Sequence, residues 1–173
     1  ALANVARLDF VDDLPRPGAV TSGGIRALPE YAAKTLLATK GFVIPAGWLA
    51  GSPDKAAAAA DRVGYPVSLK IQSCAIPHNS DGAGVRLGLK NAAAVRTAWE
   101  DIKESIYRNA PDADFDGMLV EEMAPRFTLE MVVSARRDPA WGVVVIAGLG
   151  GVFTELMHDI RMFPAGLSKD RIR

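Results

Sequence analysis

A lysine and a histidine stand in one short stretch of the chain that also contains a glycine-rich turn. Lys70 lies in the apolar segment 67–71, and His78 precedes Gly82-Ala83-Gly84. A lysine supplies a fixed positive charge, glycines expose backbone N–H groups to an anion, and an imidazole can accept a phosphoryl group. This combination of residues is suited to phosphate chemistry.

Two predicted strands flank this loop. Apolar and polar residues alternate over 67–71 and again over 85–89, which is the period-two pattern of half-buried strands. Lys70 alternates with the apolar positions. We therefore expect its side chain on the face of the strand opposite the apolar side chains.

Helix signals precede and follow these strands. Three segments carry the capping and terminating residues of helices, at residues 29–40, 52–64 and 91–111. The order is helix, strand, helix, strand, strand, helix, and Gly117 to Glu122 forms a further strand. This order predicts an α/β chain with mixed sheets covered by helices.

The second half of the chain has the pattern of a hairpin. Residues 129–135 alternate as a strand, Asp138-Pro139 forms a turn, and the apolar strand 141–147 follows. A glycine turn then leads into a predicted strand at 152–156. Met123-Ala124-Pro125 is suited to a hinge between lobes. We predict three parts: a linker from an upstream region at 1–27, a first lobe at 28–116, and the start of a second lobe at 117–173.

The composition excludes several classes of partner. Twenty basic residues balance twenty acidic ones, so we expect no nucleic-acid partner. No apolar run approaches the roughly 20 residues of a membrane-spanning helix, so we expect no membrane partner. Cys74 is the single cysteine, which agrees with a reducing compartment and predicts a cytoplasmic location.

Several segments of the chain form a distinctive ordered set. They are Pro29–Leu37, Gly41–Pro45, Gly64–Ile71, Ile76–Gly84, Val120–Met123, Leu129–Glu130, Arg137–Pro139 and Gly148–Glu155. In this order they resemble the ATP-grasp domain of nucleoside-diphosphate-forming (ADP-forming) acyl-CoA synthetases, which is related to the nucleotide-binding subunit of succinyl-CoA synthetase. The resemblance implies a two-lobe ATP-grasp fold of the α+β type. An ordered set of this length is more specific than any single motif.

The resemblance implies an acid–CoA ligase that converts ATP, a carboxylic acid and CoA to acyl-CoA, ADP and phosphate. His78 matches the loop histidine that carries the phosphoryl group, and Lys70 matches a strand lysine on the nucleotide phosphates. Nucleotide contacts are further implied for Ser80, Gly82, Gly84, Val120, Glu121, Glu122, Met123 and Glu130. Glu155 is the implied Mg²⁺ ligand. CoA and the small-molecule carboxylic acid are expected on a partner CoA-binding or ligase domain, upstream or on a separate chain.

The chain departs from the family pattern in three places. Asn79 replaces a usual lysine, and Gly82-Ala83-Gly84 replaces a valine-glycine-glycine stretch. The chain also stops at Arg173, before the aspartates that hold magnesium in the family. We therefore expect an incomplete domain that is inactive in isolation.

Two other interpretations stay open. One is a degenerate, non-catalytic nucleotide-binding module of a fused acyltransferase or regulator. The other is an ATP-grasp carboxylate ligase that works without phosphohistidine. The acid substrate and the oligomeric state are not encoded in any visible motif.

Overall fold

The computed structural model describes residues 28–74, 84–111, 113–125, 129–151, 160–168 and 170. Its chain divides into two compact units, with the division between Ala124 and Pro125. The strand Gly117–Glu122, which we expected to open the second lobe, belongs to the first sheet. The first unit therefore ends at the predicted Met123-Ala124-Pro125 bend rather than at residue 116.

The first unit alternates helices and strands in the predicted order. Its elements are α1 (Glu30–Thr39), β1 (Gly47–Ala50), α2 (Pro53–Val63), β2 (Val67–Gln72), β3 (Val85–Leu89), α3 (Ala92–Asn109) and β4 (Gly117–Glu122). The strand order is β1-β4-β2-β3, and each neighbouring pair is antiparallel. The predicted α/β class with helices covering the sheet is confirmed. In the described residues every pairing is antiparallel rather than mixed, because β4 is inserted between β1 and β2, which run in the same direction.

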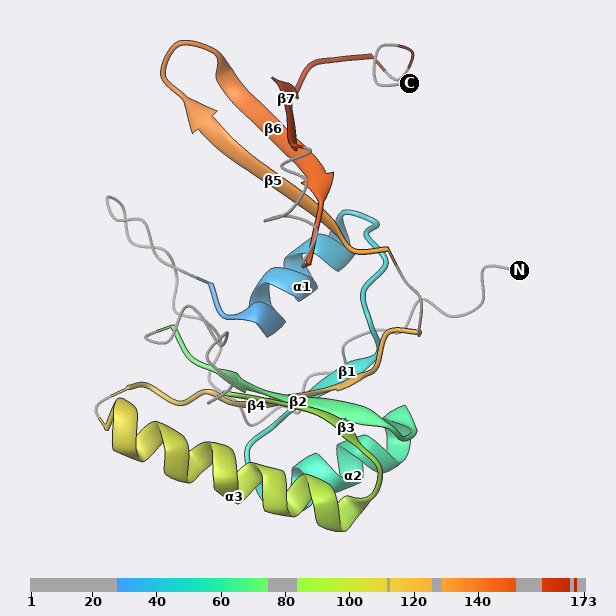
Figure 1. Cartoon of the computed structure of the whole chain (residues 1–173), viewed down its shortest axis with the longest axis vertical. Coiled ribbons are helices and arrows are strands. Elements are labelled where there is room, and N and C mark those ends of the chain that lie inside the picture. Colours follow the sequence, from blue (N-terminus) through green and yellow to red (C-terminus); the bar gives the residue numbers. More distant parts are fainter. Residues whose placement is uncertain are drawn as a thin grey trace. The chain divides into compact units, whose positions relative to one another are not determined.

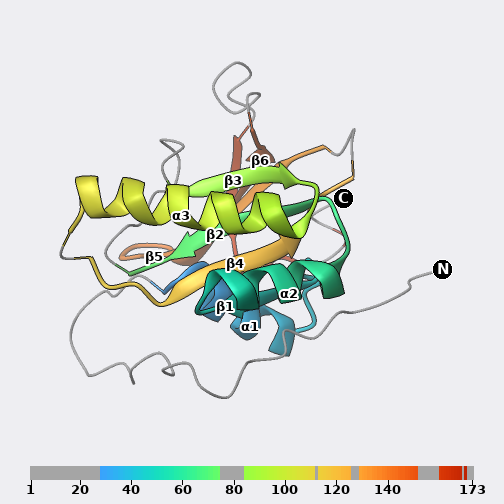
Figure 2. The same ribbon diagram turned by 90° about the horizontal axis from the view of Figure 1, so that it is seen from below.

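Helices cover both faces of this sheet. Figure 1 shows α1 on one side and α2 and α3 on the other, and Figure 2 shows α2 and α3 side by side in front of the strands. The main hydrophobic core lies under α2 and α3, where Leu69, Ile71 and Val120 pack with Trp99 and Ile102. A smaller core lies under α1 and consists of Tyr31, Leu49 and Leu119. The α1 face of the sheet thus has room for polar side chains.

Side-chain caps define where α2 and α3 begin. The Ser52 hydroxyl accepts a hydrogen bond from the Lys55 N–H at 3.2 Å, and the Asn91 amide oxygen accepts one from the Ala94 N–H at 2.8 Å. These contacts satisfy N–H groups that have no partner within the helix. The predicted start residues of both helices are confirmed.

The second unit contains a three-stranded antiparallel sheet in the described residues. It is formed by β5 (Met131–Asp138), β6 (Gly142–Leu149) and β7 (Ile160–Pro164), in that order. The predicted hairpin is confirmed, and Asp138 Oδ1 accepts hydrogen bonds from the N–H groups of Ala140 and Trp141 in its turn. The predicted strand at 152–156 lies outside the described residues.

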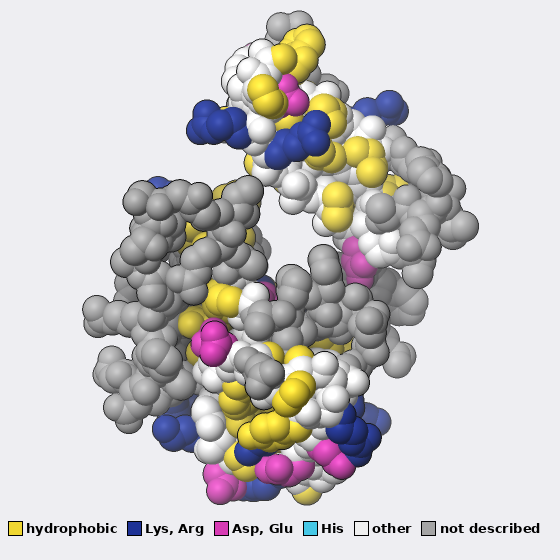
Figure 3. Space-filling view, turned by 90° about the vertical axis from the view of Figure 1, so that its left-hand side faces the viewer, with side chains coloured by type: hydrophobic (Ala, Val, Ile, Leu, Met, Phe, Trp, Pro, Cys, Tyr) yellow, Lys and Arg dark blue, Asp and Glu magenta, His cyan; other side chains and the backbone are white. Residues whose placement is uncertain are grey.

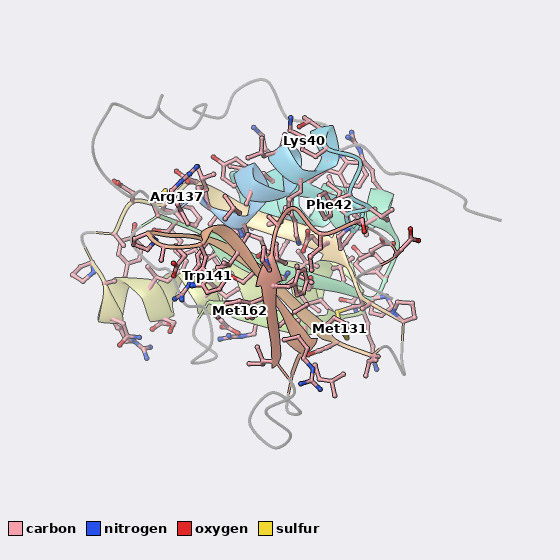
Figure 4. The ribbon with its side chains drawn as sticks, turned by 90° about the horizontal axis from the view of Figure 1, so that it is seen from above. Lys40, Phe42, Met131, Arg137, Trp141 and Met162 are labelled. Atoms are coloured by element: carbon pink, nitrogen blue, oxygen red, sulfur yellow. The ribbon has the colours of Figure 1, made fainter. Side chains whose placement is uncertain are left out.

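Apolar side chains of the second unit are widely exposed. The exposed fractions are 57% for Met131, 74% for Trp141 and 57% for Met162, three residues that Figure 4 labels on this sheet. Figure 3 shows hydrophobic and basic side chains interspersed on this unit. Among the residues that the structure describes, no helix combines the length and hydropathy needed to cross a bilayer.

Candidate functional site

Lys70 lies on an interior strand of the first sheet and its ammonium group is held by two carboxylates. Nζ donates a hydrogen bond of 2.8 Å to Glu30 Oε1 on α1 and one of 2.9 Å to Glu121 Oε2 on β4. Its side chain is 24% exposed. The predicted orientation of Lys70, away from the apolar face of β2, is confirmed.

A second lysine completes the arrangement. Lys34 Nζ lies 2.6 Å from Glu30 Oε1 and also forms an ion pair with Glu121 Oε1. We call Glu30, Lys34, Lys70 and Glu121 the charge cluster. Each ammonium group of the charge cluster contacts both carboxylates. The cluster has two negative and two positive groups, and its formal charge is therefore zero. The Glu121 side chain is only 2% exposed, whereas the Glu30 side chain is 33% exposed.

Local structure brings the four side chains together. Glu30 and Lys34 are four residues apart on α1, a spacing that places them on the same helix face. In the sheet, Glu121 pairs with Ser68, which is two residues before Lys70, so the two charged side chains are diagonal neighbours on one face. Gly47 leaves the space that the Glu121 side chain occupies, because a Cβ there would lie 2.7 Å from Glu121 Cγ.

The cluster shifts the ionisation of its members. Burial alone would raise the pKa of Glu30, but hydrogen bonds from Lys34 and Lys70 outweigh it and hold the pKa below its usual value. Burial alone would lower the pKa of Lys70, but hydrogen bonds to Glu30 and Glu121 hold it above its usual value. Both groups are therefore charged at neutral pH.

Gln72 ties α1 to the sheet beside the cluster. Its Oε1 accepts a hydrogen bond of 3.0 Å from the Tyr31 N–H, in the first turn of α1, where the N-cap residue Pro29 provides no side-chain cap. The Gln72 side chain is 1% exposed, and its Nε2 donates to the Ile71 carbonyl. A side chain of β2 thus accepts a hydrogen bond from an N–H group in the first turn of α1 that has no partner within the helix.

The predicted hinge residues lie in different environments. Val120 is buried in the core under α2 and α3, and Glu121 is buried in the charge cluster. Glu122 is exposed, and its Oε1 accepts a hydrogen bond of 2.9 Å from the Ala46 N–H. Met123 lies just beyond the end of β4. Of these four residues, Glu122 is thus the exposed one, and Met123 is half-buried.

The loop after Lys70 starts and ends at adjacent points. The Ile71 N–H donates a 2.9 Å hydrogen bond to the carbonyl of Gly84. Of the loop residues predicted to contact the nucleotide, Gly84 is the one whose position the structure describes. His78, Ser80 and Gly82 lie outside the described residues. The hydrogen bond places Gly84 beside Ile71, the residue that follows the phosphate-binding candidate Lys70.

The carboxylates of the second unit do not form a metal site in the described part. Glu130 lies just before β5, not on a strand as predicted, and is exposed. Its backbone carbonyl accepts a 2.8 Å hydrogen bond from the Gly150 N–H, and a Cβ at Gly151 would collide with its carboxylate. Glu155 lies outside the described residues. Among the residues with described positions, no three acidic, histidine or cysteine side chains are grouped to bind a metal.

Comparison with known proteins gives a consistent result. The family model described as "ATP-grasp domain" matches residues 19–173. The chain is 39% identical to trans-feruloyl-CoA synthase FCS1 from an unknown prokaryotic organism, over 94% of this chain and 23% of that protein. It is 35% identical to the acetate–CoA ligase (ADP-forming) II subunit beta of Pyrococcus furiosus, over 82% of this chain and 59% of that subunit.

Solved structures share the fold. The dinucleotide forming acetyl-coenzyme A synthetase 1 of Ca. Korarchaeum cryptofilum, in complex with coenzyme A, Ca-AMPCP and HgCl⁺, gives a TM-score of 0.79 at 38% identity, over 85% of this chain and 64% of that chain. A second structure of that synthetase, with coenzyme A and Mg-AMPPCP, has its phosphohistidine segment pointing towards the nucleotide binding site. It gives a TM-score of 0.65 at 34% identity, over 82% of this chain and 58% of that chain. This chain thus spans less than two thirds of these relatives.

Proposed function

The chain belongs to the ATP-grasp domain family, and from that premise we propose that it is the nucleotide-binding part of an ADP-forming acyl-CoA synthetase. The whole protein would convert ATP, a carboxylic acid and CoA to acyl-CoA, ADP and phosphate. The relatives named above are CoA ligases or synthetases, and they support this reaction class. The observation that carries the proposal is the position of the partly exposed Lys70 ammonium on an interior strand of the sheet, next to Ile71, whose N–H donates to the Gly84 carbonyl.

In the proposed reaction, Lys70 binds the phosphates of the nucleotide. Its ammonium group is fixed on an interior strand of the sheet and is only partly buried, so it can neutralise phosphate oxygens without moving the backbone. Ser80, Gly82 and Gly84 would add loop contacts to the phosphates, and Glu122 and Met123 would contact the adenosine. Glu130 stays a predicted nucleotide contact.

His78 is proposed to carry the phosphoryl group. The bond between the γ-phosphorus and the bridging oxygen breaks, ADP leaves with the electron pair, and a phosphorus–nitrogen bond forms on the imidazole. The phosphoryl group then passes to the partner region, where it activates the acid as an acyl phosphate. Attack by CoA on the acyl phosphate releases inorganic phosphate.

Magnesium is proposed to arrive as part of the nucleotide substrate. Glu30 and Glu121 are already paired with lysines, and no three acidic, histidine or cysteine side chains in the described residues are grouped to bind a metal. Mg²⁺ prefers oxygen ligands and keeps several waters, which nucleotide phosphates allow. Glu155 stays a predicted ligand. The CoA-binding partner is a separate domain or subunit in this proposal.

Phosphorylation of the complete protein tests the histidine relay. After incubation with γ-labelled ATP, we expect a label that is labile in acid, stable in base and absent from His78→Ala. His158→Ala is the matched control, because it removes the other histidine of the chain and should keep the label. An active enzyme without such a label would instead be a ligase that activates the carboxylate directly.

A further inference from the structure

The two carboxylates of the charge cluster differ in how much water reaches them. The Glu121 side chain is 2% exposed and the Glu30 side chain is 33% exposed. Loss of a partner leaves a buried carboxylate as an uncompensated charge, whereas a partly exposed one regains water. We propose that Glu30 is an intramolecular competitor for the Lys70 ammonium, displaced by the phosphates of a bound nucleotide, and that Glu121 is the fixed positioning residue.

The charges of the cluster support this division. With both carboxylates in place, the formal charge of the cluster is zero, so an approaching polyanion gains little net Coulomb energy. When Glu30 turns away from Lys70 and stays paired with Lys34, Lys70 keeps one carboxylate partner, Glu121, in place of two. The charge around the Lys70 ammonium is then less negative, which favours binding of an anion there.

The backbone positions of the two residues support it as well. Glu30 is the first residue of α1, next to Pro29, and Lys34 on the following turn lies 2.6 Å from its carboxylate. Glu30 can therefore leave Lys70 and stay paired with Lys34. Glu121 lies on β4, which pairs with β1 on one side and β2 on the other, so its backbone cannot shift without breaking both ladders.

The inference rests on the proposed function and is tested by ligand affinities of the complete protein. The probes are MgADP, inorganic tripolyphosphate and adenosine. For Glu30→Gln we expect MgADP and tripolyphosphate to bind about three- to tenfold more tightly, because one negative charge is removed next to Lys70. Adenosine affinity should not change. A purely structural role of Glu30 would weaken all three ligands or leave all three unchanged.

Three further variants sharpen the test. Glu121→Gln should weaken MgADP by about tenfold or more, since it removes the fixed partner of Lys70. Glu30→Asp restores the charge and should bring the affinities back towards wild type. Asp54→Asn is the matched acid-to-amide control on α2, where Asp54 forms an exposed ion pair with Arg96, and it should change nothing. Urea unfolding of each variant checks that it is folded.

The outcomes separate this inference from the proposed function. If wild type binds MgADP, Lys70→Met abolishes that binding, and Glu30→Gln gains no affinity, the competitor role of Glu30 is wrong and the proposed function stands. A gain that extends equally to adenosine also overturns it. If wild type does not bind MgADP at all, the proposed function fails, and the inference fails with it.

Discussion

At the residue scale, the described part of the candidate site is a network of four ion pairs within the protein. Lys70 and Lys34 each contact both Glu30 and Glu121, so removal of any one residue leaves an uncompensated charge. The net stabilisation by a partly buried ion pair depends strongly on its surroundings. Removing one partner is nevertheless destabilising, because the other partner remains as a buried, uncompensated charge. The cluster therefore couples the position of α1 to the charge state of its members.

The stability of the protein should fall on both sides of neutral pH. Despite burial, the lysines hold the pKa of Glu30 below its usual 4.5, so this stabilisation is present above pH 4.5 and is lost as the pH falls through the folded pKa. Despite burial, the carboxylates hold the pKa of Lys70 above its usual 10.5, so its contribution is present below pH 10.5 and is lost as the pH rises through the folded pKa.

Urea unfolding as a function of pH measures both effects. We expect Glu30→Gln to show a smaller loss of unfolding free energy below pH 4.5 than wild type. Lys70→Met should show a smaller loss above pH 10.5. The exposed pair of Asp54 and Arg96 supplies the control, because Asp54→Asn should leave both limbs unchanged. Parallel pH profiles for all variants would contradict the role of the cluster.

Gly47 should be required for the position of Glu121. A Cβ at residue 47 would lie 2.7 Å from Glu121 Cγ and 2.8 Å from the Val120 carbonyl oxygen. Gly47→Ala should therefore lower the free energy of unfolding by about 1–3 kcal/mol, the usual cost of overpacking. Gly166→Ala is the matched control, because beyond its two chain neighbours no atom lies within 4 Å of its Cβ position. Equal stability changes in the two variants would contradict this prediction.

The sequence predicted some of these residues but not their partners. The alternation over 67–71 placed Lys70 on the correct face, and the order of motifs singled out Glu121. The helix pattern over 29–40 assigns no ion-pair partner to Glu30 or Lys34. Glu121, a partner of Lys34, is 87 residues away from it, and pattern reasoning within single elements carries no signal for a contact of that range.

At the element scale, local signals located the helices while the sheet depended on distant contacts. Ser52 and Asn91 cap α2 and α3 where their residue types indicated. The insertion of β4 between β1 and β2 was not predictable, because strand periodicity gives a buried face and not a neighbour. No strand was expected at residues 160–164, where β7 pairs with β6.

Gln72 should control how firmly α1 is held. Gln72→Met removes the acceptor for the Tyr31 N–H and keeps the length of the side chain, so it should lower the free energy of unfolding by about 1–3 kcal/mol. Hydrogen exchange of the α1 amides, Tyr31 first, should be faster than in wild type. Ser52→Ala should instead act at the start of α2, on the Lys55 amide. Faster exchange at Lys55 rather than Tyr31 in Gln72→Met would contradict this role.

At the scale of the whole molecule, the two units differ in how much core they contain. Almost all buried hydrophobic side chains lie before residue 121, under α1 or under α2 and α3. In the described part of the second unit, Val144 is the one buried hydrophobic residue, at 4% exposure. The sheet of β5, β6 and β7 therefore has less hydrophobic stabilisation of its own.

The two units should consequently differ when they are expressed separately. We expect residues 28–124 to unfold in one cooperative urea transition, because they contain both hydrophobic cores and the capped helices. Residues 125–173 should show no cooperative transition, since a small sheet with exposed Met131, Trp141 and Met162 cannot offset its conformational entropy. The unfolding of each fragment in urea is measured by circular dichroism and tryptophan fluorescence. A cooperative transition in 125–173 would show that the sheet is stable without the rest of the chain. The size of the hydrophobic core would then not explain a difference in stability between the units.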